Sequence, residues 1–401
     1  MSQDSAGFQG GTGCGDGVEF DFETPLDRRR YPTTKWQQYD EDVLPLWVAD
    51  MDFAVAPVIE RALAERVAHP VYGYTHAGAA LKRALCDWSA HHYGWQIEPD
   101  WQLWLPGVVP ALHVASLALT EPGDGVLTVT PIYPPFLHVA DNTGRLAQTA
   151  PMRAPTAEDP AWRLDFEALE AAVTPKTRLL LWCHPHNPTG RVFDAGELRR
   201  LADFVERHDL LVCSDELHCD LILDGEPHRP LAHAEPRLAH RTITLWAASK
   251  TFNVAGLTSA CAVISDPTLR RRFWRGCLGL MPSDNIMGQV AAEAAYAAGA
   301  PWRQALLERL RDNRTLLSDY VARWPGVSMA NPEATYLAWL DLREAGLGDA
   351  PQKVLLERAR VALNDGADFG WPGFVRLNFG TERARLEAAL LRLDALLSRP
   401  A

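Results

Sequence analysis

The chain has 401 residues, of which 47% are hydrophobic, so it is long enough to bury a large core and to form more than one domain. Its formal net charge of −12 argues against a nucleic-acid partner, because such binding usually depends on a basic patch. No apolar stretch approaches the roughly 18 residues that a membrane-spanning helix needs, so we expect no membrane segment.

The N-terminal residues and the cysteines indicate the kind of protein to expect. Residues 1–18 are rich in Gly, Ser and Asp and lack a basic-then-apolar leader pattern, which predicts a disordered tail. The seven cysteines are odd in number, form no C-x-x-C pair and lie in several cases within apolar runs. They indicate buried free thiols of a cytoplasmic protein rather than a disulfide framework or a metal site.

Short apolar runs alternate with helical periodicities from Trp101 onward. The alternation of fully apolar strands with helices predicts a mostly parallel sheet that helices cover on both faces, which is an α/β fold. The strand candidates are 101–105, 126–130, 179–183, 210–214, 242–247 and 261–265, and the helix candidates between them are 111–119 and 196–208.

The rhythm changes in the last third of the chain. A smaller α+β region is predicted there, because long helices are followed by isolated strands and helices. The helical patterns cover 285–298, 302–324, 352–361 and a segment from Glu382 onward, and the strand-like segments are 336–342 and 374–379.

Two charged residues follow neighbouring strand candidates, where ligands of parallel α/β sheets usually bind. Lys250 follows 242–247, and a lysine in an apolar or cationic site can condense with an aldehyde. Asp215 ends the preceding strand, where a buried carboxylate is costly unless a group such as a protonated pyridine nitrogen pairs with it. Taken alone, such a lysine is most often a solvated surface residue, and the aspartate is as often a turn cap.

Four other features could likewise either bind a ligand or have an ordinary structural role. Asn187, in His-Pro-His-Asn-Pro-Thr-Gly, could bind an oxygen on a ring, or mark an ordinary turn. Gly107 precedes a helix whose first amides could cradle a phosphate. Tyr133 could stack on a heteroaromatic ring or lie in the core. Arg376 alternates with apolar neighbours in a late strand and could form a fork to a carboxylate.

Three motifs occur along the chain in an order and approximate spacing that are typical of one enzyme family: Asn-Pro-Thr-Gly, Ser-Asp-Glu-x-His and Ser-Lys-Thr-Phe-Asn-x-Ala-Gly. Together they resemble the fold-type-I enzymes that depend on pyridoxal 5′-phosphate (PLP), in the class I/II aminotransferase superfamily, and the resemblance extends from about Phe20 to Leu397. Within the superfamily the chain most resembles the cystathionine β-lyase or C–S lyase branch, the MalY/PatB type. The motifs that indicate this branch are Leu-Trp-Val-Ala-Asp-Met-Asp-Phe at 46–53, Tyr-Gly-Tyr-Thr at 72–75 and Lys-Thr-Phe-Asn-Val-Ala-Gly-Leu at 250–257.

The resemblance implies a role for each residue around the ring of the cofactor. Lys250 would bind PLP as a Schiff base, and Asp215 would pair with the pyridinium nitrogen. Asn187 and His218 would contact the ring hydroxyl, and Tyr133 would stack on the ring.

The resemblance also implies contacts at the phosphate and at the substrate. Val108, Val109 and Ser249 would hold the phosphate, and Tyr74 would reach it from a second subunit, so a homodimer is expected. Arg376 would bind the carboxylate of a small amino-acid substrate.

The domain organisation implied by the resemblance has a large PLP-binding domain with a seven-stranded sheet and a smaller C-terminal domain. We expect a tail at 1–18, an arm packing with the small domain at 19–50, the large domain at 51–285 and the small domain at 286–401.

The chain departs from the common aminotransferase pattern in two places. That pattern has an arginine soon after the lysine, whereas here Gly256-Leu-Thr-Ser follows and the next basic residue is Arg270, which favours the lyase branch. His184 stands where an asparagine is common, and the sequence predicts no role for it. Cys183, His184 and His186 could suggest a metal site, but the adjacent prolines and the missing fourth ligand argue against one.

The predicted reaction is β-elimination of cystathionine or a related S-substituted cysteine to pyruvate, ammonia and a thiol, with Lys250 as the base that takes the Cα proton. An aminotransferase would use the same lysine and ring, so the cofactor motifs leave that alternative open. An additional regulatory binding role, as in some members of the branch, also stays open, although no residue supports it directly.

Overall fold

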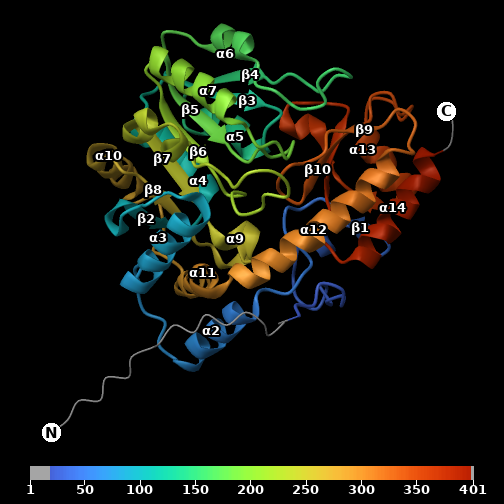
Figure 1. Cartoon of the computed structure of the whole chain (residues 1–401), viewed down its shortest axis with the longest axis horizontal. Helices are drawn as coiled ribbons and strands as arrows, with labels where there is room; N and C mark the ends of the chain where they lie inside the picture. The colour runs from blue at the N-terminus through green and yellow to red at the C-terminus, as the bar shows by residue number, and fades with distance from the viewer. Residues whose placement is uncertain (1–18, 399–401) are drawn as a thin grey trace.

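A seven-stranded sheet forms the centre of the larger part of the molecule (Figure 1). Its strands are, in spatial order, β2 (Gln102–Leu105), β8 (Ala260–Val263), β7 (Thr242–Trp246), β6 (Leu211–Asp215), β5 (Thr177–Cys183), β3 (Gly125–Thr130) and β4 (Leu146–Pro151). Of these strands, β8 alone is antiparallel to the other six, so the predicted mostly parallel sheet is confirmed. The computed structural model describes residues 19–398, and the tail predicted at 1–18 lies outside them.

Helices cover both faces of this sheet, and the side chains of β5 explain why its strands are apolar throughout. Leu179 and Leu181 pack into the core on one face, whereas Leu180 and Trp182 pack on the other, and all four are fully buried. The first face is covered by α4 (Val108–Leu119), α5 (Pro134–Asn142) and α10 (Pro267–Cys277), and the second by α6 (Phe166–Ala172), α7 (Ala195–Arg207) and α8 (Leu231–Ala234).

Strand β4 is the one strand of this sheet that the sequence pattern does not predict. It pairs in parallel with β3 at the edge of the sheet, and only Ala150 among its six residues is fully buried. Because most of its side chains face solvent, the segment Leu-Ala-Gln-Thr-Ala-Pro lacks the apolar run that reveals the central strands.

A second, antiparallel sheet forms the C-terminal part of the chain, in the predicted α+β arrangement (Figure 1). Its order is β12 (Asn364–Asp365), β13 (Phe374–Asn378), β10 (Leu337–Asp341) and β9 (Ser328–Met329), and α12 (Ala300–Val321) packs with α14 (Arg383–Leu397) beside it. The helix predicted at 352–361 is instead α13 (Pro351–Val354) followed by a π-helical turn, Leu355–Ala359. It ends early because Arg360 has a positive φ of 55°, which turns the chain into β11 (Val361–Ala362).

The N-terminal arm is tied to the C-terminal sheet region and then runs toward the larger part. Strand β1 (Leu44–Pro45) pairs in parallel with β11. After it the segment 46–53 leads to α2 (Pro57–Ala68), and α2 and α3 (Ala79–Tyr93) pack on α11 (Ile286–Ala298). The arm is held by a fully buried ion pair in which Lys35 Nζ lies 2.9 Å from Asp52 Oδ2.

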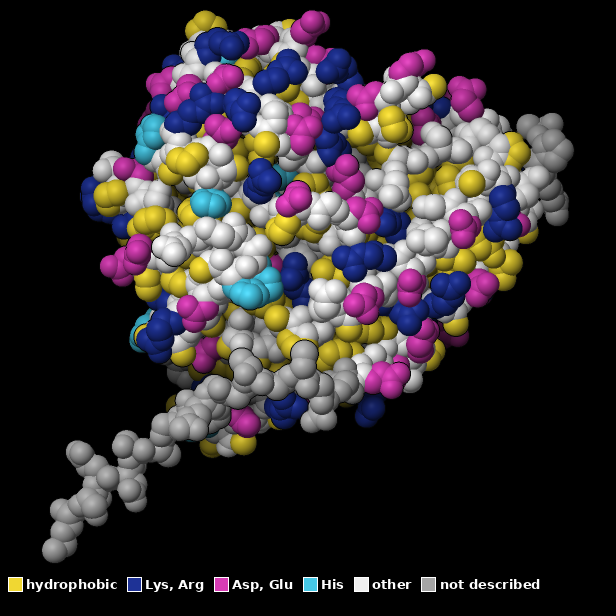
Figure 2. Space-filling model, viewed as in Figure 1, with side chains coloured by type: hydrophobic (Ala, Val, Ile, Leu, Met, Phe, Trp, Pro, Cys, Tyr) yellow, Lys and Arg dark blue, Asp and Glu magenta, His cyan; other side chains and the backbone are white. Residues whose placement is uncertain are grey.

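The surface is of mixed charge where it is visible. On the face shown in Figure 2, basic and acidic side chains are interspersed over both parts of the molecule. None of the helices in residues 19–398 has the length and apolar character to cross a lipid bilayer.

Candidate active site

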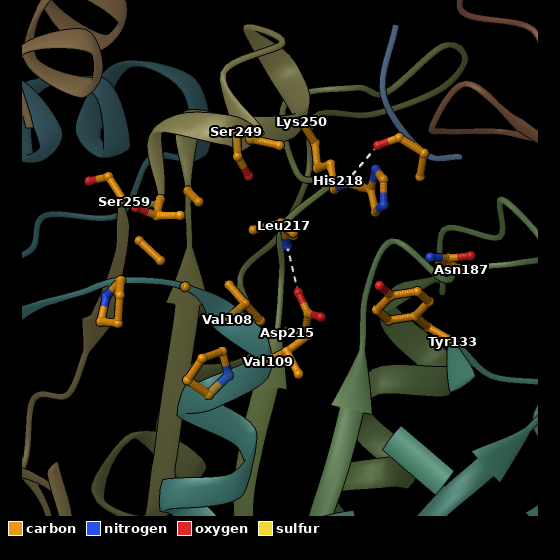
Figure 3. A pocket seen from close by; sticks show the side chains of 18 of the residues that line it. Val108, Val109, Tyr133, Asn187, Asp215, Leu217, His218, Ser249, Lys250 and Ser259 are labelled. Atoms are coloured by element: carbon orange, nitrogen blue, oxygen red, sulfur yellow. Dashed lines mark hydrogen bonds between the residues drawn. The ribbon is translucent and has the colours of Figure 1, made fainter. Parts of the chain in front are cut away.

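A cavity of about 240 Å³ lies at the edge of the large sheet where the carboxyl ends of β3, β5, β6 and β7 meet. Parallel strands place the residues that follow them at one edge, so residues far apart in the sequence converge there (Figure 3). The cavity brings together eight of the ten predicted site residues: Val108, Val109, Tyr133, Asn187, Asp215, His218, Ser249 and Lys250. Arg376 and Tyr74 are not part of its lining.

Lys250 lies in α9 (Ala248–Thr251), a short helical turn that follows β7 directly. Its Nζ donates a hydrogen bond of 2.7 Å to the main-chain oxygen of Ala49. Burial lowers the pKa of the Lys250 amine to about 8, and the charge of Arg376 acts in the same direction. The amine is therefore partly neutral near physiological pH, as attack on an aldehyde requires.

Asp215 is the last residue of β6, and its carboxylate points into the cavity (Figure 3). The amide of Leu217 donates to its Oδ1 at 3.0 Å, and Oδ2 has no hydrogen-bond partner among residues 19–398. Burial raises the pKa of the Asp215 carboxyl to about 7. A cationic N–H donor in the cavity would satisfy the free oxygen and restore the ionised form.

One end of the cavity carries neutral donors that could bind an anion. Helix α4 begins at Val108 without a side-chain cap, so the amides of Val108 and Val109 are available to an anion, whereas Pro110 has no N–H. The hydroxyl residues Ser249, Thr258 and Ser259 line the same cavity. The sequence does not predict Thr258 and Ser259, although they lie in the stretch that lacks the common arginine.

Arg376 reaches the site from β13 of the C-terminal sheet and is 3% exposed. It donates to Asn187 Oδ1 at 3.0 Å, to Asn364 Oδ1 at 2.7 Å and to the main-chain oxygen of Trp47 at 3.1 Å. Its Nε is buried without a partner in the described chain, and burial lowers the pKa of the guanidinium to about 10. Because all three partners are neutral oxygens, the charge remains available to a substrate carboxylate.

Tyr133 and Asn187 lie on the opposite side of the cavity from Ser249, with Asp215 and Lys250 between the two sides (Figure 3). Burial raises the pKa of the Tyr133 phenol, so its ring stays neutral. Burial lowers the pKa of His218 to about 3, and its Nδ1 is buried without a partner in residues 19–398. A neutral imidazole with a free nitrogen can bind an oxygen of a ligand.

Other residues lie apart from the cavity. Tyr74 is 99% exposed in the segment between α2 and α3, so nothing within one chain brings it to the site. His184 is buried and its Nε2 accepts a hydrogen bond of 3.1 Å from the amide of Phe193, and His186 Nδ1 lies 2.8 Å from Thr189 Oγ1. Both histidines therefore stabilise the turn that carries Asn187.

Sequence reasoning missed the arm residue that contacts Lys250. The main-chain oxygen of Ala49 accepts from Lys250, and Tyr336 Oη donates to the same oxygen at 3.0 Å. The motif at 46–53 indicated the family branch only, because a contact made through a backbone carbonyl leaves no signal in the side-chain pattern.

The chain matches the family model described as Aminotransferase class I and II over residues 41–393, and it belongs to that family of PLP-dependent enzymes. The predicted family, fold class and cofactor are therefore confirmed.

Particular relatives span nearly the whole chain. Cystathionine beta-lyase PatB of Bacillus subtilis (strain 168) is 37% identical over 391 residues, which cover 94% of this chain and 100% of the relative. The crystal structure of OvoB is 42% identical, with a TM-score of 0.91 and coverage of 95% of this chain and 100% of that one. Cystalysin from Treponema denticola, whose structure contains PLP, is 31% identical, with a TM-score of 0.89 and coverage of 95% and 99%.

The residues of the cavity fit PLP in their donor chemistry. The free oxygen of Asp215 suits the ring N–H, and the neutral fraction of Lys250 suits the aldehyde. The uncapped start of α4 suits the phosphate, and the unpartnered Nδ1 of His218 suits the ring hydroxyl.

Proposed function

We propose that the protein is a PLP-dependent carbon–sulfur β-lyase. It converts cystathionine or another S-substituted cysteine, with one water, into pyruvate, ammonia and a thiol. The observation that carries this proposal is the convergence of the buried Lys250 amine, the half-paired Asp215 carboxylate and the uncapped start of α4 in one cavity. Similarity to PatB, 37% identical along nearly the whole chain, supports β-elimination as the reaction.

When bound, PLP supplies an electron sink that is conjugated to the Cα of the substrate. Asp215 would keep the ring nitrogen protonated through an ion pair, which would also offset the cost of its own burial. Asn187 and His218 would bind the ring hydroxyl, and Tyr133 would contact the ring. Val108, Val109 and Ser249 would hold the phosphate through two amides and a hydroxyl, a role that the uncapped start of α4 in the cavity lining supports.

Arg376 and Lys250 act on the substrate itself. Arg376 would bind the carboxylate and thereby fix the orientation of the substrate Cα–H bond in the cavity. The free amine of Lys250 takes that proton, and a pKa of about 8 suits a base that works near neutral pH. The Cβ–S bond then breaks and its electron pair leaves with the sulfur as a thiolate.

An aminotransferase is the alternative, and one relative favours it. The probable N-succinyldiaminopimelate aminotransferase DapC of Mycobacterium tuberculosis is 30% identical over 80% of this chain. The test is incubation with cystathionine in the absence of any keto acid. Release of pyruvate and a thiol is the expected result, whereas strict dependence on a keto-acid acceptor would establish transamination instead.

We propose further that the enzyme is a homodimer in which Tyr74 of a second subunit reaches the phosphate. Exposed apolar side chains in two segments support this: Val71 and Tyr74 are 62% and 99% exposed, and Leu278 and Leu280 are 61% and 62% exposed. Light scattering should give twice the chain mass of 44.4 kDa. A monomer with full activity would contradict the role of Tyr74.

The domain division and the location are also proposals. We assign 19–50 to an arm, 51–285 to the large domain and 286–401 to the small domain, and the pairing of β1 with β11 supports the assignment of the arm. A cytoplasmic location is supported by the six cysteines of the described chain, all of which are free and five of which are buried.

A further inference from the structure

The main-chain carbonyl of Ala49 receives two hydrogen bonds from different parts of the molecule. Lys250 Nζ, at the edge of the large sheet, donates to it at 2.7 Å. Tyr336 Oη, directly before β10 of the C-terminal sheet, donates to it at 3.0 Å. Both Ala49 and Tyr336 are buried, so solvent does not readily replace either donor.

The carbonyls on either side of Ala49 have donors that take no part in the reaction. Asn378 Nδ2 donates to the main-chain oxygens of Val48 and Asp50 at 2.6 Å each. Asn253 Nδ2 donates to the main-chain oxygen of Met51 at 3.0 Å. The arm is thus fixed on both sides of the one carbonyl that binds the reactive lysine.

The backbone around Tyr336 holds the phenol in place. Thr335 has a positive φ of 72°, a strained conformation for a β-branched residue, and its Oγ1 accepts from the amide of Leu337 at 3.0 Å. Gly380 leaves room for the ring, because a Cβ there would lie 3.2 Å from Tyr336 Cγ and 2.8 Å from Met51 Cγ. The ring of Tyr336 is therefore held by its own surroundings, without a hydrogen bond to Lys250.

These contacts matter because the proposed function requires Lys250 to leave Ala49 when it bonds to PLP and to be free again during turnover. A buried carbonyl without any donor is costly. We propose that the Ala49 carbonyl is the acceptor that holds the free amine of Lys250, and that Tyr336 is a positioning residue that keeps this carbonyl paired and aimed while Lys250 is bonded to PLP. The inference rests on the proposed function for its place in turnover.

The hydrogen bond to Ala49 would orient the amine of Lys250 as a base. A neutral amine has two N–H donors and one lone pair. When one N–H of Lys250 is fixed on the Ala49 oxygen, the lone pair has fewer directions available, and the amine is held ready to take the Cα proton.

The first test needs no cofactor and measures the stability of the full chain freed of PLP. The free energies of unfolding of wild type, Tyr336→Phe, Lys250→Met and the double variant form a cycle. Each single variant leaves the Ala49 carbonyl one donor, whereas the double variant leaves none. If the two changes acted independently, their effects on the free energy of unfolding would add. We expect the unfolding equilibrium constant of the double variant to be roughly fivefold or more above the value that this additivity gives. Additive effects would overturn the inference.

The second test measures the dissociation constant of PLP in the same variants. In the presence of Lys250, Tyr336→Phe should raise it roughly 5- to 100-fold, since bonding of the lysine to PLP then strips the carbonyl of its last donor. In the Lys250→Met background, Tyr336→Phe should leave the dissociation constant of PLP unchanged. Without Lys250, the binding of PLP does not alter the number of donors to the Ala49 carbonyl. An equal rise in both backgrounds would mean a merely structural role and would overturn the inference.

A control is Tyr320→Phe, which removes the hydroxyl of another largely buried tyrosine, on α12, while it keeps the ring. It should couple to Lys250 in neither test. A wild-type chain that binds no PLP would refute the proposed function, and the stability cycle would still decide whether Lys250 and Tyr336 share the Ala49 carbonyl.

Discussion

The two sides of the cavity are built from different parts of the polypeptide. On the side of the large sheet, the functional groups are side chains at strand ends, such as Asp215 and Lys250. On the side of the arm, they are main-chain carbonyls of residues 47–51, which side chains from both parts of the molecule hold in place. The first kind of group is visible in a sequence motif, and the second depends on how the chain is folded.

The two sides also differ in how they carry buried charge. Asp215 and Lys250 have pKa values of about 7 and 8 because burial disfavours their charged forms. At the C-terminal end of the arm, burial opposes ionisation of Asp52, but Lys35 of the arm prevails and lowers the pKa of that carboxyl. The sheet side therefore keeps incompletely paired groups for chemistry, whereas the arm keeps paired groups for structure.

The largest expected effect is the loss of Lys250. Lys250→Ala removes both the group that bonds to PLP and the base, so the rate of pyruvate release should fall by about 10⁴-fold or more. Borohydride should then no longer fix PLP to the chain. The exposed Lys176→Ala is the control and should keep wild-type activity. A Lys250→Ala rate within tenfold of wild type would contradict the assignment.

On the arm side, Lys35→Met should act on stability. It leaves the fully buried Asp52 without its nearest cationic partner, and breaking such a pair costs about 3–5 kcal/mol of unfolding free energy. Because the pair lowers the pKa of Asp52, its contribution is present above the ordinary carboxyl pKa of about 3.9 and is lost as the pH falls through the folded value.

Denaturant titration measures this loss, with Lys176→Met as an exposed control that should shift stability by less than about 0.5 kcal/mol. A loss below about 1 kcal/mol for Lys35→Met would mean that Arg28 and Trp36, which also contact Asp52, suffice to hold the carboxylate.

Asp215→Asn should increase the free energy of unfolding, whereas Lys35→Met should decrease it. The pKa of Asp215 rises from 3.8 to about 7 on folding, so its ionisation disfavours the cofactor-free fold increasingly as the pH rises from 4 to 7. At pH 8 the variant should be more stable by up to about 4 kcal/mol, at 1.36 kcal/mol per pKa unit, and below pH 4 the gain should vanish.

Activity should fall in the same variant, because the ring nitrogen of PLP loses its anionic partner. Thermal unfolding at the two pH values measures the gain, and the exposed Asp100→Asn is the control. A variant that is no more stable than wild type at pH 8 would show that Asp215 is already paired in the cofactor-free protein.

The smallest expected effect is at the phosphate. Ser249→Ala removes one neutral hydroxyl among several donors, so the dissociation constant of PLP should rise about fivefold. Ser265→Ala, whose hydroxyl donates to the Ala239 oxygen at 3.0 Å away from the cavity, should leave it unchanged. Equal values for the two variants would exclude Ser249 from phosphate binding.

The sequence alone allowed the central strands and the residues directly after them to be predicted. A strand that is buried on both faces must be apolar throughout, and a polar residue directly after it stands out, as Asp215 does after β6. Strand β4 was not predicted because most of its side chains face solvent, and the helix predicted at 352–361 ends at Ala359 because Arg360 turns the backbone.

What the sequence by itself determined is therefore which side chains line the cavity, since motifs at strand ends and the family resemblance pointed to them. Only the tertiary structure decided that Lys250 and Tyr336 both donate to the Ala49 oxygen, because these residues lie 201 and 287 positions from Ala49 and the acceptor is a backbone oxygen. Every residue has such an oxygen. Its function comes from the donors that the fold brings to it.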